Sequence, residues 1–419
     1  MKKKQSNLIA GLDIGSSNVR MAVGQFHAGH DGSTDLQILA AVEYLSEGVH
    51  KGKINSIEDV VSSVSACLER AERMVGVPID TVWVGISGLH IILQNSKGVV
   101  AVSKTDNEIS EEDVSRALEA ARSIATPLNY EVLHVLPRSY AVDGQFSIKD
   151  PVGMTGIRLE VDSNIILGAS SQIKNLTKAV YRTGLEIEDL VLSILASSEA
   201  VLTKRQKDLG VAVVNIGAAT TSLVVFEEGE MIHTAVLPLG SENITNDLAI
   251  GLRTSVDISE EVKKEFGDCR PEQYTQKDEI DLKQAGADDH EMVKRKYVNE
   301  IIQARVEEIL QKVDEELVAV QRSGLLPAGV VFTGGGAKLP GLVECAKKVL
   351  RLPATLGYPL NVVSVTEKVN DLSYATAVGL VRWGAIMDEM SVGGASPLVL
   401  KSVGKAGNQL KKWVKALIP

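Results

Sequence analysis

The chain of 419 residues is poor in aromatic residues, in cysteine and in positive charge, and each shortage argues against a class of function. Aromatic residues make up only 4% of the sequence, which argues against surfaces that stack bases or sugars. The formal net charge is −10, whereas a general nucleic-acid binder needs a basic surface, so no nucleic-acid partner is expected. The three cysteines form no Cys-x-x-Cys pair, so neither a disulfide scaffold nor a zinc site is expected, and a reducing cytosol is the natural compartment.

Long hydrophobic runs are also missing. No apolar stretch reaches the roughly 18 residues of a transmembrane helix. The chain starts with MKKKQSNLIAGLDIG, which reaches glycine and aspartate too early for a signal peptide. We therefore expect a soluble, cytoplasmic protein whose length and 44% apolar content allow two or more domains.

The most informative pattern is an internal repeat. Its two copies are LDIGSSNVRMAV at 12–23 and VNIGAATTSLVV at 214–225, which align without gaps and place Asp13 and Asn215 at equivalent positions. Each copy reads as an apolar strand, a glycine turn with small residues and a second apolar strand. Each opens what reads as a βββαβα half, so the sequence predicts a duplicated α/β domain that faces itself across a cleft.

Helical periodicity is found between and after the two copies. Helices are expected over 56–75 with Ser56 as N-cap, over 110–124 opening with the capping sequence SEED, and over 172–183 and 292–323. Short strands on both sides of 110–124 indicate a small α+β module.

The turn of each repeat copy is suited to phosphate binding. Gly15 and Gly217 let the backbone approach a ligand closely, and successive N–H groups can form an anion nest. Asp13 ends a strand and is placed to hold the water shell of Mg²⁺, because this ion keeps several waters and takes few direct carboxylates. Hydroxyl donors are expected from Ser16, Ser17, Thr220 and Thr221.

A third candidate element is the glycine run Gly334-Gly335-Gly336, between a strand and a helix start. It would let a nucleoside lie flat against the backbone, with the helix N-terminus favouring nearby phosphate. Each turn alone is a weak signal, because glycine often ends strands for turn geometry. The order of hairpin, hairpin and triple glycine is what indicates a nucleotide site.

Two charged features near these turns have two interpretations each. Glu260 and Lys263 are spaced as a helical i,i+3 pair, which is either a ribose contact or a solvated ion pair. Arg20 either reaches a phosphate or is a strand-surface arginine, and we favour the second interpretation.

In this order the motifs resemble those of the actin/Hsp70/sugar-kinase superfamily, and family-specific stretches narrow the resemblance to the FtsA family of bacterial cell-division proteins. These stretches are SGLH at 87–90, VLHVLPRSYAVDG at 132–144, KDPVGMTGIRLEVD at 149–162, LASSEAVLT at 195–203 and AVGLVRWG at 377–384. The resemblance implies an α/β, actin-like (ribonuclease H-like) fold of duplicated domains around a nucleotide cleft, with an FtsA-type 1C subdomain.

The resemblance also implies a division of the chain. The expected parts are subdomain 1A at 7–85 and 164–197, 1C at 86–163, 2A at 198–234 and 302–387, 2B at 235–301, a linker at 388–404 and a membrane-targeting amphipathic helix at 405–419.

For function, the resemblance implies ATP and Mg²⁺ in the cleft, protofilaments of the chain with itself, and tethering of the tubulin-like protein FtsZ. The place implied is the cytoplasmic side of the cell membrane at the division septum, where later division proteins would bind through 1C. By motif position, the site for the FtsZ C-terminal tail falls on Arg295, Arg305 and Glu308, and the alternative is a charged helix face.

One departure from the family concerns catalysis. Many relatives have Asp at the position of Asn215, and often an acidic residue at that of Ser222. An amide cannot act as a carboxylate toward Mg²⁺ or as a general base. We therefore assign no catalytic residue and expect ATPase activity to be weak or absent.

The end of the chain differs from the rest, because residues 391–419 contain no Asp or Glu and carry five lysines. On a helix, its apolar and lysine side chains separate onto opposite faces, as in helices that lie in the headgroups of anionic lipid. The alternative is a helix docked on the protein's own core. The residues expected to contact the membrane are Leu410, Lys411, Lys412, Trp413, Val414, Lys415, Leu417 and Ile418.

Two other functions are compatible with the phosphate turns. An actin-fold small-molecule kinase would need a general-base Asp near its substrate and no membrane helix. A scaffold like the pilus assembly protein PilM would lack the 1C signature and the terminal helix.

Overall fold

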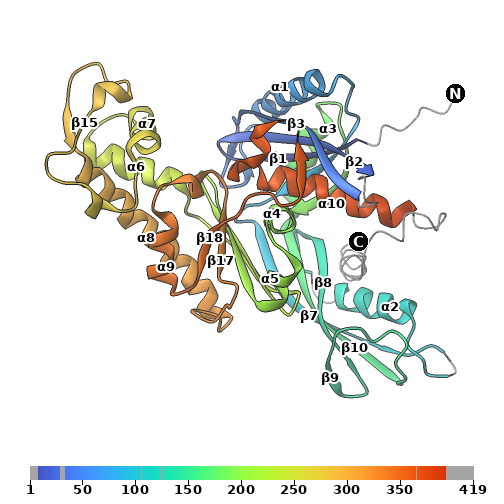
Figure 1. Cartoon of the computed structure of the whole chain (residues 1–419). Helices are drawn as coiled ribbons and strands as arrows, with labels where there is room; N and C mark the ends of the chain where they lie inside the picture. Colours follow the sequence, from blue (N-terminus) through green and yellow to red (C-terminus); the bar gives the residue numbers. More distant parts are fainter. Residues whose placement is uncertain (1–7, 29–33, 105, 124–125, 365, 393–419) are drawn as a thin grey trace.

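The computed structural model describes residues 8–28, 34–104, 106–123, 126–364 and 366–392, arranged as two α/β halves, a third small sheet and a helical lobe (Figure 1). The expected membrane helix and most of the expected linker lie outside the described residues. Helix α10 (Ala375–Val392) covers the first positions of that linker.

The first half is built on a six-stranded sheet in the order β11-β6-β1-β2-β3-β19. Strands β1, β2 and β3 run antiparallel in sequence, whereas β6 is parallel to β1 and β11 is parallel to β6. Helices α1 and α3 pack together on one side, and α4 and α10 on the other (Figure 1). The elements are β1 (Ile9–Ile14), β2 (Asn18–Ala28), β3 (Thr34–Leu45), β4 (Val49–His50), β5 (Lys53–Ile54), α1 (Ile57–Val75), β6 (Thr81–Ile86), α3 (Ser170–Tyr181), β11 (Glu186–Leu192), α4 (Ser193–Val201) and β19 (Val362–Ser364).

The second half repeats this plan in a five-stranded sheet in the order β14-β13-β12-β17-β18. Strands β12 and β13 form an antiparallel hairpin, and β17 is parallel to β12 as β6 is to β1. The predicted duplication is therefore confirmed. The elements are α5 (Lys204–Leu209), β12 (Val211–Ile216), β13 (Thr221–Glu227), β14 (Glu230–Leu237), β17 (Val330–Thr333), η3 (Gly335–Lys338), α9 (Leu342–Leu350), β18 (Ala354–Leu356), η4 (Glu367–Asn370) and η5 (Leu372–Tyr374).

The inserted α+β module is a four-stranded sheet in the order β7-β10-β8-β9 with one helix against it. It has a small core of its own, which includes Ala117, Tyr140 and Leu159. The capping sequence works as expected, because the hydroxyl of Ser110 and the carboxylate of Asp113 each accept from the other's backbone N–H. The elements are β7 (Ile91–Ala101), α2 (Glu111–Arg122), β8 (Tyr130–Val142), β9 (Gln145–Ile148) and β10 (Arg158–Ala169).

The helical lobe packs its helices around a core that continues into the second sheet (Figure 1). Its long helix is shorter than the expected 292–323, because Met292–Lys294 pairs with β15 as a strand and the helix ends at Ala319. The elements are α6 (Ser241–Leu252), α7 (Val256–Phe266), η1 (Pro271–Gln273), β15 (Glu279–Asp281), η2 (Leu282–Ala285), β16 (Met292–Lys294) and α8 (Arg295–Ala319).

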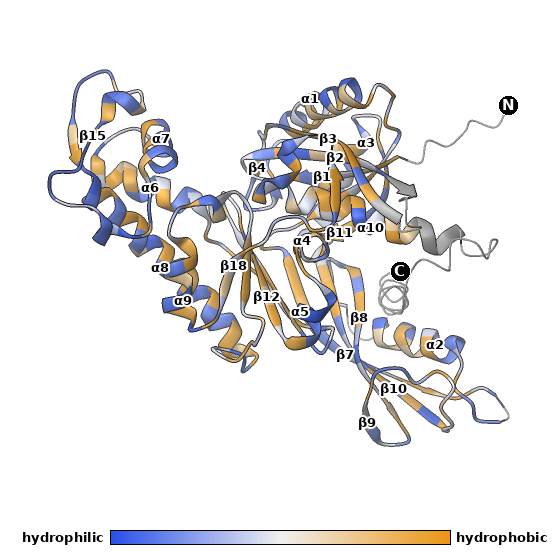
Figure 2. Cartoon of the chain, in the orientation of Figure 1, coloured by the Kyte–Doolittle hydropathy of each residue, from blue (hydrophilic) through white to orange (hydrophobic). Residues whose placement is uncertain are grey.

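Apolar residues run along central strands such as β12, while the loop around β15 at the outer end of the lobe is polar (Figure 2). The remaining helix predictions hold within two residues: α1 has Ser56 as its N-cap, and α3 begins at Ser170. Among the described residues, no helix is both long and apolar enough to cross a bilayer.

Candidate nucleotide site

The two repeat copies form hairpin turns of the same geometry. In the first turn, Gly15 N donates to Asn18 O at 3.1 Å, and in the second, Gly217 N donates to Thr220 O at 2.9 Å. A Cβ on either glycine would lie 2.9 Å from that same carbonyl oxygen, so both turns depend on glycine. The loop N–H groups of each turn are thus held in the same compact arrangement, which suits an oxyanion.

The hydroxyl donors differ between the turns. Ser16 and Ser17 lie at the surface of the first turn, and Ser17 Oγ donates to the Asn18 side chain at 2.8 Å. Thr221 is fully buried at the position equivalent to the core residue Val19, and its Oγ1 has no hydrogen-bond partner among the described residues. Thr220, one residue earlier, lies within the turn and is partly exposed.

Asp13 lies at the end of β1 and faces the neighbouring strand β6. Its Oδ1 is 3.5 Å from where a Cβ on Gly85 would lie, and no described residue donates a hydrogen bond to its carboxylate. Burial raises the pKa of Asp13 to about 6, and the nearby charge of Arg20 limits the rise. A half-buried carboxylate without a partner fits a role toward a cation at this turn.

The surroundings of Asp13 limit how Mg²⁺ would be held. The described residues contain no group of three or more His, Cys, Asp or Glu side chains that could form a protein cage. Mg²⁺ would therefore depend on Asp13, water and phosphate oxygens, which is the coordination this ion commonly takes.

Arg20 is mostly buried and lies beside Glu43 and Tyr374 in this structure. Its Nε lies 3.2 Å from a Glu43 carboxylate oxygen, and its guanidinium stands 5.8 Å from the centre of the Tyr374 ring. The side chain is only 17% exposed. The favoured strand-surface interpretation is therefore wrong, because Arg20 is an inward arginine that compensates the charge of its neighbours.

Asn215, the counterpart of Asp13, belongs to a neutral network. Its Nδ2 lies 3.4 Å from Ser197 Oγ and 3.3 Å from Thr376 Oγ1, and these two hydroxyls are 2.9 Å apart. The network joins β12 to helices α4 and α10. At this position the second half supplies a structural amide where the first half supplies a carboxylate.

The glycine run lies directly against the second hairpin. A side chain at Gly334 would collide with Asn215, and a Cβ at Gly336 would lie 2.5 Å from Ile216 Cγ2. A Cβ at Gly335 would meet nothing within 4 Å, so this position faces open space. The run opens only the short 3-10 turn η3, and helix α9 begins at Leu342, so the expected α-helix N-terminus beside the glycine run is wrong.

Glu260 and Lys263 are not a solvated pair. Lys263 is 9% exposed, and its ammonium donates to Ser241 O at 3.2 Å, Thr245 Oγ1 at 2.8 Å and Glu260 Oε2 at 2.6 Å. These bonds use all three protons of the ammonium. Ser241 N in turn donates to Gly217 O at 2.9 Å. Lys263 thus ties the start of α6 to the second phosphate turn.

Glu260 differs from Lys263 in having one oxygen to spare. Burial alone would raise its pKa, but hydrogen bonds from Lys263 and Thr245 hold it below the usual value. Both bonds go to Oε2, whereas Oε1 has only Lys264 Nζ at 3.7 Å. The side chain is a third exposed, so Oε1 is able to accept from a ligand hydroxyl.

Sequence reasoning missed the hydroxyl contact between the two halves. Ser87 Oγ, just after β6, lies 3.1 Å from Ser222 Oγ in β13. In the strand register Ser222 lies opposite Asn215, as Arg20 lies opposite Asp13. The equivalence of Ser222 and Arg20 was predictable from the repeat, whereas no sequence signal pointed to Ser87.

The residues assigned to the FtsZ tail lie on α8, but two of them are already paired. Arg305 is 23% exposed and holds both carboxylate oxygens of Asp247 on α6, at 2.5 and 2.9 Å, as well as Glu308. Arg295 stands 4.4 Å from the centre of the Tyr274 ring. In this structure the Arg305 guanidinium is therefore already engaged by Asp247 and Glu308.

Comparisons with known proteins agree with this architecture. The family model described as "Cell division protein FtsA" matches residues 212–379, and the model described as "SHS2 domain inserted in FTSA" matches residues 88–167. The cell division protein FtsA of Pseudomonas aeruginosa is 35% identical over 98% of each chain. The protein of that name in Bacillus subtilis is 39% identical over 90% of this chain and 83% of its own.

Solved structures share the fold at low identity. A PilM–PilN type IV pilus biogenesis complex matches with a TM-score of 0.64 and 18% identity over 90% of this chain and 98% of the other. MreB5 of Spiroplasma citri bound to AMPPNP matches with a TM-score of 0.55 and 12% identity over 94% of this chain and 100% of the other. These likenesses identify an actin-like fold, and the second family model matches the inserted module within it.

Proposed function

The chain belongs to the FtsA family of cell-division proteins, and on this premise we propose that it binds ATP in its cleft, forms protofilaments on the cytoplasmic face of the cell membrane at the division septum, and tethers FtsZ there. The observation that carries the nucleotide part is the pair of matching glycine turns, one in each half, with Gly335 facing open space beside the second. MreB5, which shares the fold, is described with the ATP analogue AMPPNP.

In this proposal each part of the site has one task. The first turn, with Gly15, Ser16 and Ser17, and the second, with Gly217 and Thr220, hold phosphate oxygens through backbone N–H groups and hydroxyls. Asp13 holds the water shell of Mg²⁺, which supplies positive charge to the phosphates when bound. Gly334-Gly335-Gly336 makes room for the nucleoside, and Glu260 Oε1 accepts from a ribose hydroxyl.

Hydrolysis is proposed to be slow or absent. Asn215 and Ser222 offer an amide and a hydroxyl, neither of which is a base strong enough to activate water at neutral pH. Nucleotide would then act chiefly by holding the two halves together.

The membrane part of the proposal depends on residues 405–419. Lysines near an anionic surface contribute about 1 kcal/mol each, and burial of a large apolar side chain contributes about 1.5–3 kcal/mol. A single helix this short binds reversibly, so many copies in a filament are needed for firm attachment. Later division proteins are proposed to bind through the inserted module, subdomain 1C.

The FtsZ tail is proposed to bind at the lobe formed by α6, α7 and α8, which corresponds to subdomain 2B and the start of 2A. Arg295 and Glu308 stay candidates there. Arg305 contributes to this proposed site indirectly, because its pairing with Asp247 holds α8 against α6.

Flotation with vesicles of anionic lipid tests the assembled function directly. We expect FtsZ to float only when the full-length chain and ATP are present, and Trp413→Glu to abolish flotation of both proteins. Ser402→Glu is the control, because it adds the same charge within the linker, outside the expected membrane face. Flotation of Trp413→Glu at the wild-type level would contradict the membrane assignment, and vesicles that carry the chain without FtsZ would contradict the tether.

A further inference from the structure

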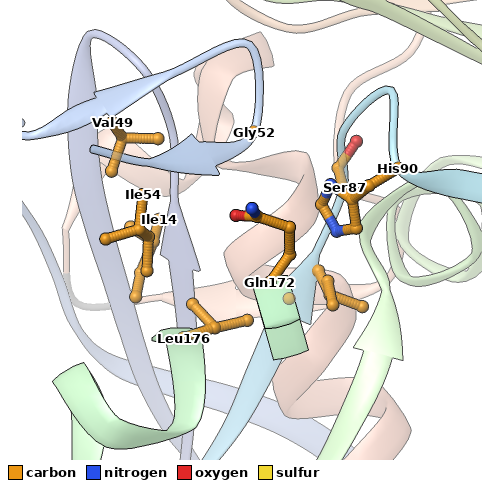
Figure 3. Close-up of a pocket in the computed structure, with 10 residues that line it drawn as sticks. Ile14, Val49, Gly52, Ile54, Ser87, His90, Gln172 and Leu176 are labelled. Atoms are coloured by element: carbon orange, nitrogen blue, oxygen red, sulfur yellow. The ribbon is translucent and has the colours of Figure 1, made fainter. Parts of the chain in front are cut away.

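A small cavity lies where the inserted module joins the first sheet. The space open to the centre of a water-sized sphere is about 20 Å³. Figure 3 shows its wall, which includes Ile14 at the end of β1, Ser87 and His90 after β6, and Gln172 and Leu176 on α3. It adjoins the residue that precedes the first phosphate turn, and its polar side chains other than Ser87 are distinct from those described at the nucleotide site.

The two chain segments that connect the first sheet to the inserted module, here called crossings, meet at this cavity. The chain enters the module through the loop that contains Ser87 and His90, and it leaves β10 at Ala169 to begin α3. Ala169 N donates to His90 O at 3.2 Å, which ties the two crossings together. Gly52, in the β4–β5 hairpin, closes one side, because a side chain there would collide with the Ser87 carbonyl.

Two polar side chains at the cavity have buried atoms without a partner. His90 is 6% exposed, and neither of its ring nitrogens has a hydrogen bond within the described part of the chain. The same is true of Gln172 Oε1. Such atoms are rarely left unpaired in a folded protein, because the loss of hydration is not repaid.

The chemistry of His90 and Gln172 defines which molecule can occupy the cavity. Burial lowers the pKa of His90 to about 4, and the charge of Lys53 adds to the shift, so the imidazole is neutral at physiological pH. A neutral imidazole has one N–H donor and one acceptor nitrogen, and Gln172 Oε1 is an acceptor. The occupant must therefore donate and accept hydrogen bonds, carry no charge and fit a very small space.

We propose that His90 and Gln172 hold one internal water molecule at the joint of the inserted module. Buried waters make about two to four hydrogen bonds and need at least about 10–15 Å³ of such space. A His90 ring nitrogen and Gln172 Oε1 supply two partners, and the cavity supplies the space. The water bridges a residue on the entering crossing to a residue on the returning one. The module is therefore joined to the nucleotide-binding sheet through an exchangeable bridge, in addition to its direct backbone bond.

A double-mutant cycle tests this bridge, because no direct hydrogen bond joins His90 to Gln172. The variants are His90→Phe, Gln172→Leu and the double variant, with Leu176→Met as a wall substitution that keeps both polar groups. Hydrogen exchange of the peptides around 87–91 and 169–173 is the measurement. We expect each single variant to speed exchange several-fold, the double variant to add little to the larger single effect, and Leu176→Met to resemble wild type.

Purely additive effects of the two substitutions would overturn the proposal. If either variant fails to fold, the wild-type chain supplies two independent readings. A high-resolution crystal structure should show a water within hydrogen-bond distance of a His90 ring nitrogen and Gln172 Oε1. The ¹⁵N spectrum of His90 should stay that of a neutral ring to below pH 5. A dry cavity, or a His90 that titrates near its ordinary value of about 6.5, would reject the site.

Discussion

Replacing Lys263 with methionine removes the ammonium that ties α6 to the second phosphate turn, while keeping most of the side chain's length. In the wild type this ammonium donates to Ser241 O, Thr245 Oγ1 and Glu260 Oε2, and Ser241 N donates to Gly217 O. The proposed ATP site therefore loses a support of its second turn, although no ribose contact is removed. Lys264→Met is the matched control, since Lys264 is exposed and pairs with Glu261 at 3.0 Å, with Glu260 Oε1 farther away at 3.7 Å.

The magnitude follows from these bonds. A hydrogen bond to a charged group contributes about 1.5–3 kcal/mol, and the partial exposure of Glu260 screens its share. We expect the free energy of unfolding to fall by about 2 kcal/mol, at the lower part of that range. For ATP we expect roughly tenfold weaker binding, which corresponds to about 1.4 kcal/mol.

Titration calorimetry with ATP and with 2′- and 3′-deoxy-ATP distinguishes a residue that supports the second phosphate turn from one that contacts the ribose. Lys263→Met should weaken all three ligands by the same factor, so that the preference for ATP is unchanged. Glu260→Gln should reduce that preference, because Glu260 Oε1 is the proposed ribose acceptor. A selective loss of ribose preference in Lys263→Met, or an unchanged ATP affinity, would refute the assignment of Lys263 as a support.

Three further outcomes are expected. Asn215→Asp should release phosphate from ATP at or above the wild-type rate, because a carboxylate, unlike an amide, can act toward Mg²⁺ or as a general base; a slower variant would contradict our view of that position. Arg305→Glu should lower the melting temperature, because it places like charges beside Asp247; the added change Asp247→Arg should restore it, and if the double variant melts no higher, the pair does not fix α8. Since burial raises the pKa of Asp13 to about 6, its carboxylate is protonated below that value; Mg²⁺-dependent ATP affinity should fall as the pH drops from 7 to 5, and a flat profile would exclude Asp13 as the residue that holds Mg²⁺.

The parts of the structure that depend on local pattern could be predicted from the sequence. The two hairpins follow from alternating apolar residues on either side of a glycine turn, and the cap at Ser110 follows from its spacing to Asp113. The repeat aligns Thr221 with Val19, and both side chains are buried in the structure. The burial of Thr221 was therefore predictable from the repeat, because equivalent positions of a hairpin face the same way.

The charged residues could not be placed in this way. The contacts of Lys263 and Arg305 could not be predicted, because their partners, Ser241 and Asp247, come from another helix. A helical i,i+3 spacing shows which residues share a face, but it does not show what covers that face. The pairing of buried charges is decided by tertiary packing, which periodicity does not report.

Binding of ATP and Mg²⁺ to wild type and to Gly335→Val, measured by titration calorimetry, tests the central claim most directly. A Cβ at Gly335 would enter open space, so the fold should tolerate the branched side chain while the nucleoside does not. Gly335→Ala serves as the graded control, with an intermediate loss of affinity. The account predicts saturable binding to wild type and none to Gly335→Val at an unchanged melting temperature. Equal affinity of the two proteins for ATP would contradict the assignment of this cleft as the nucleotide site.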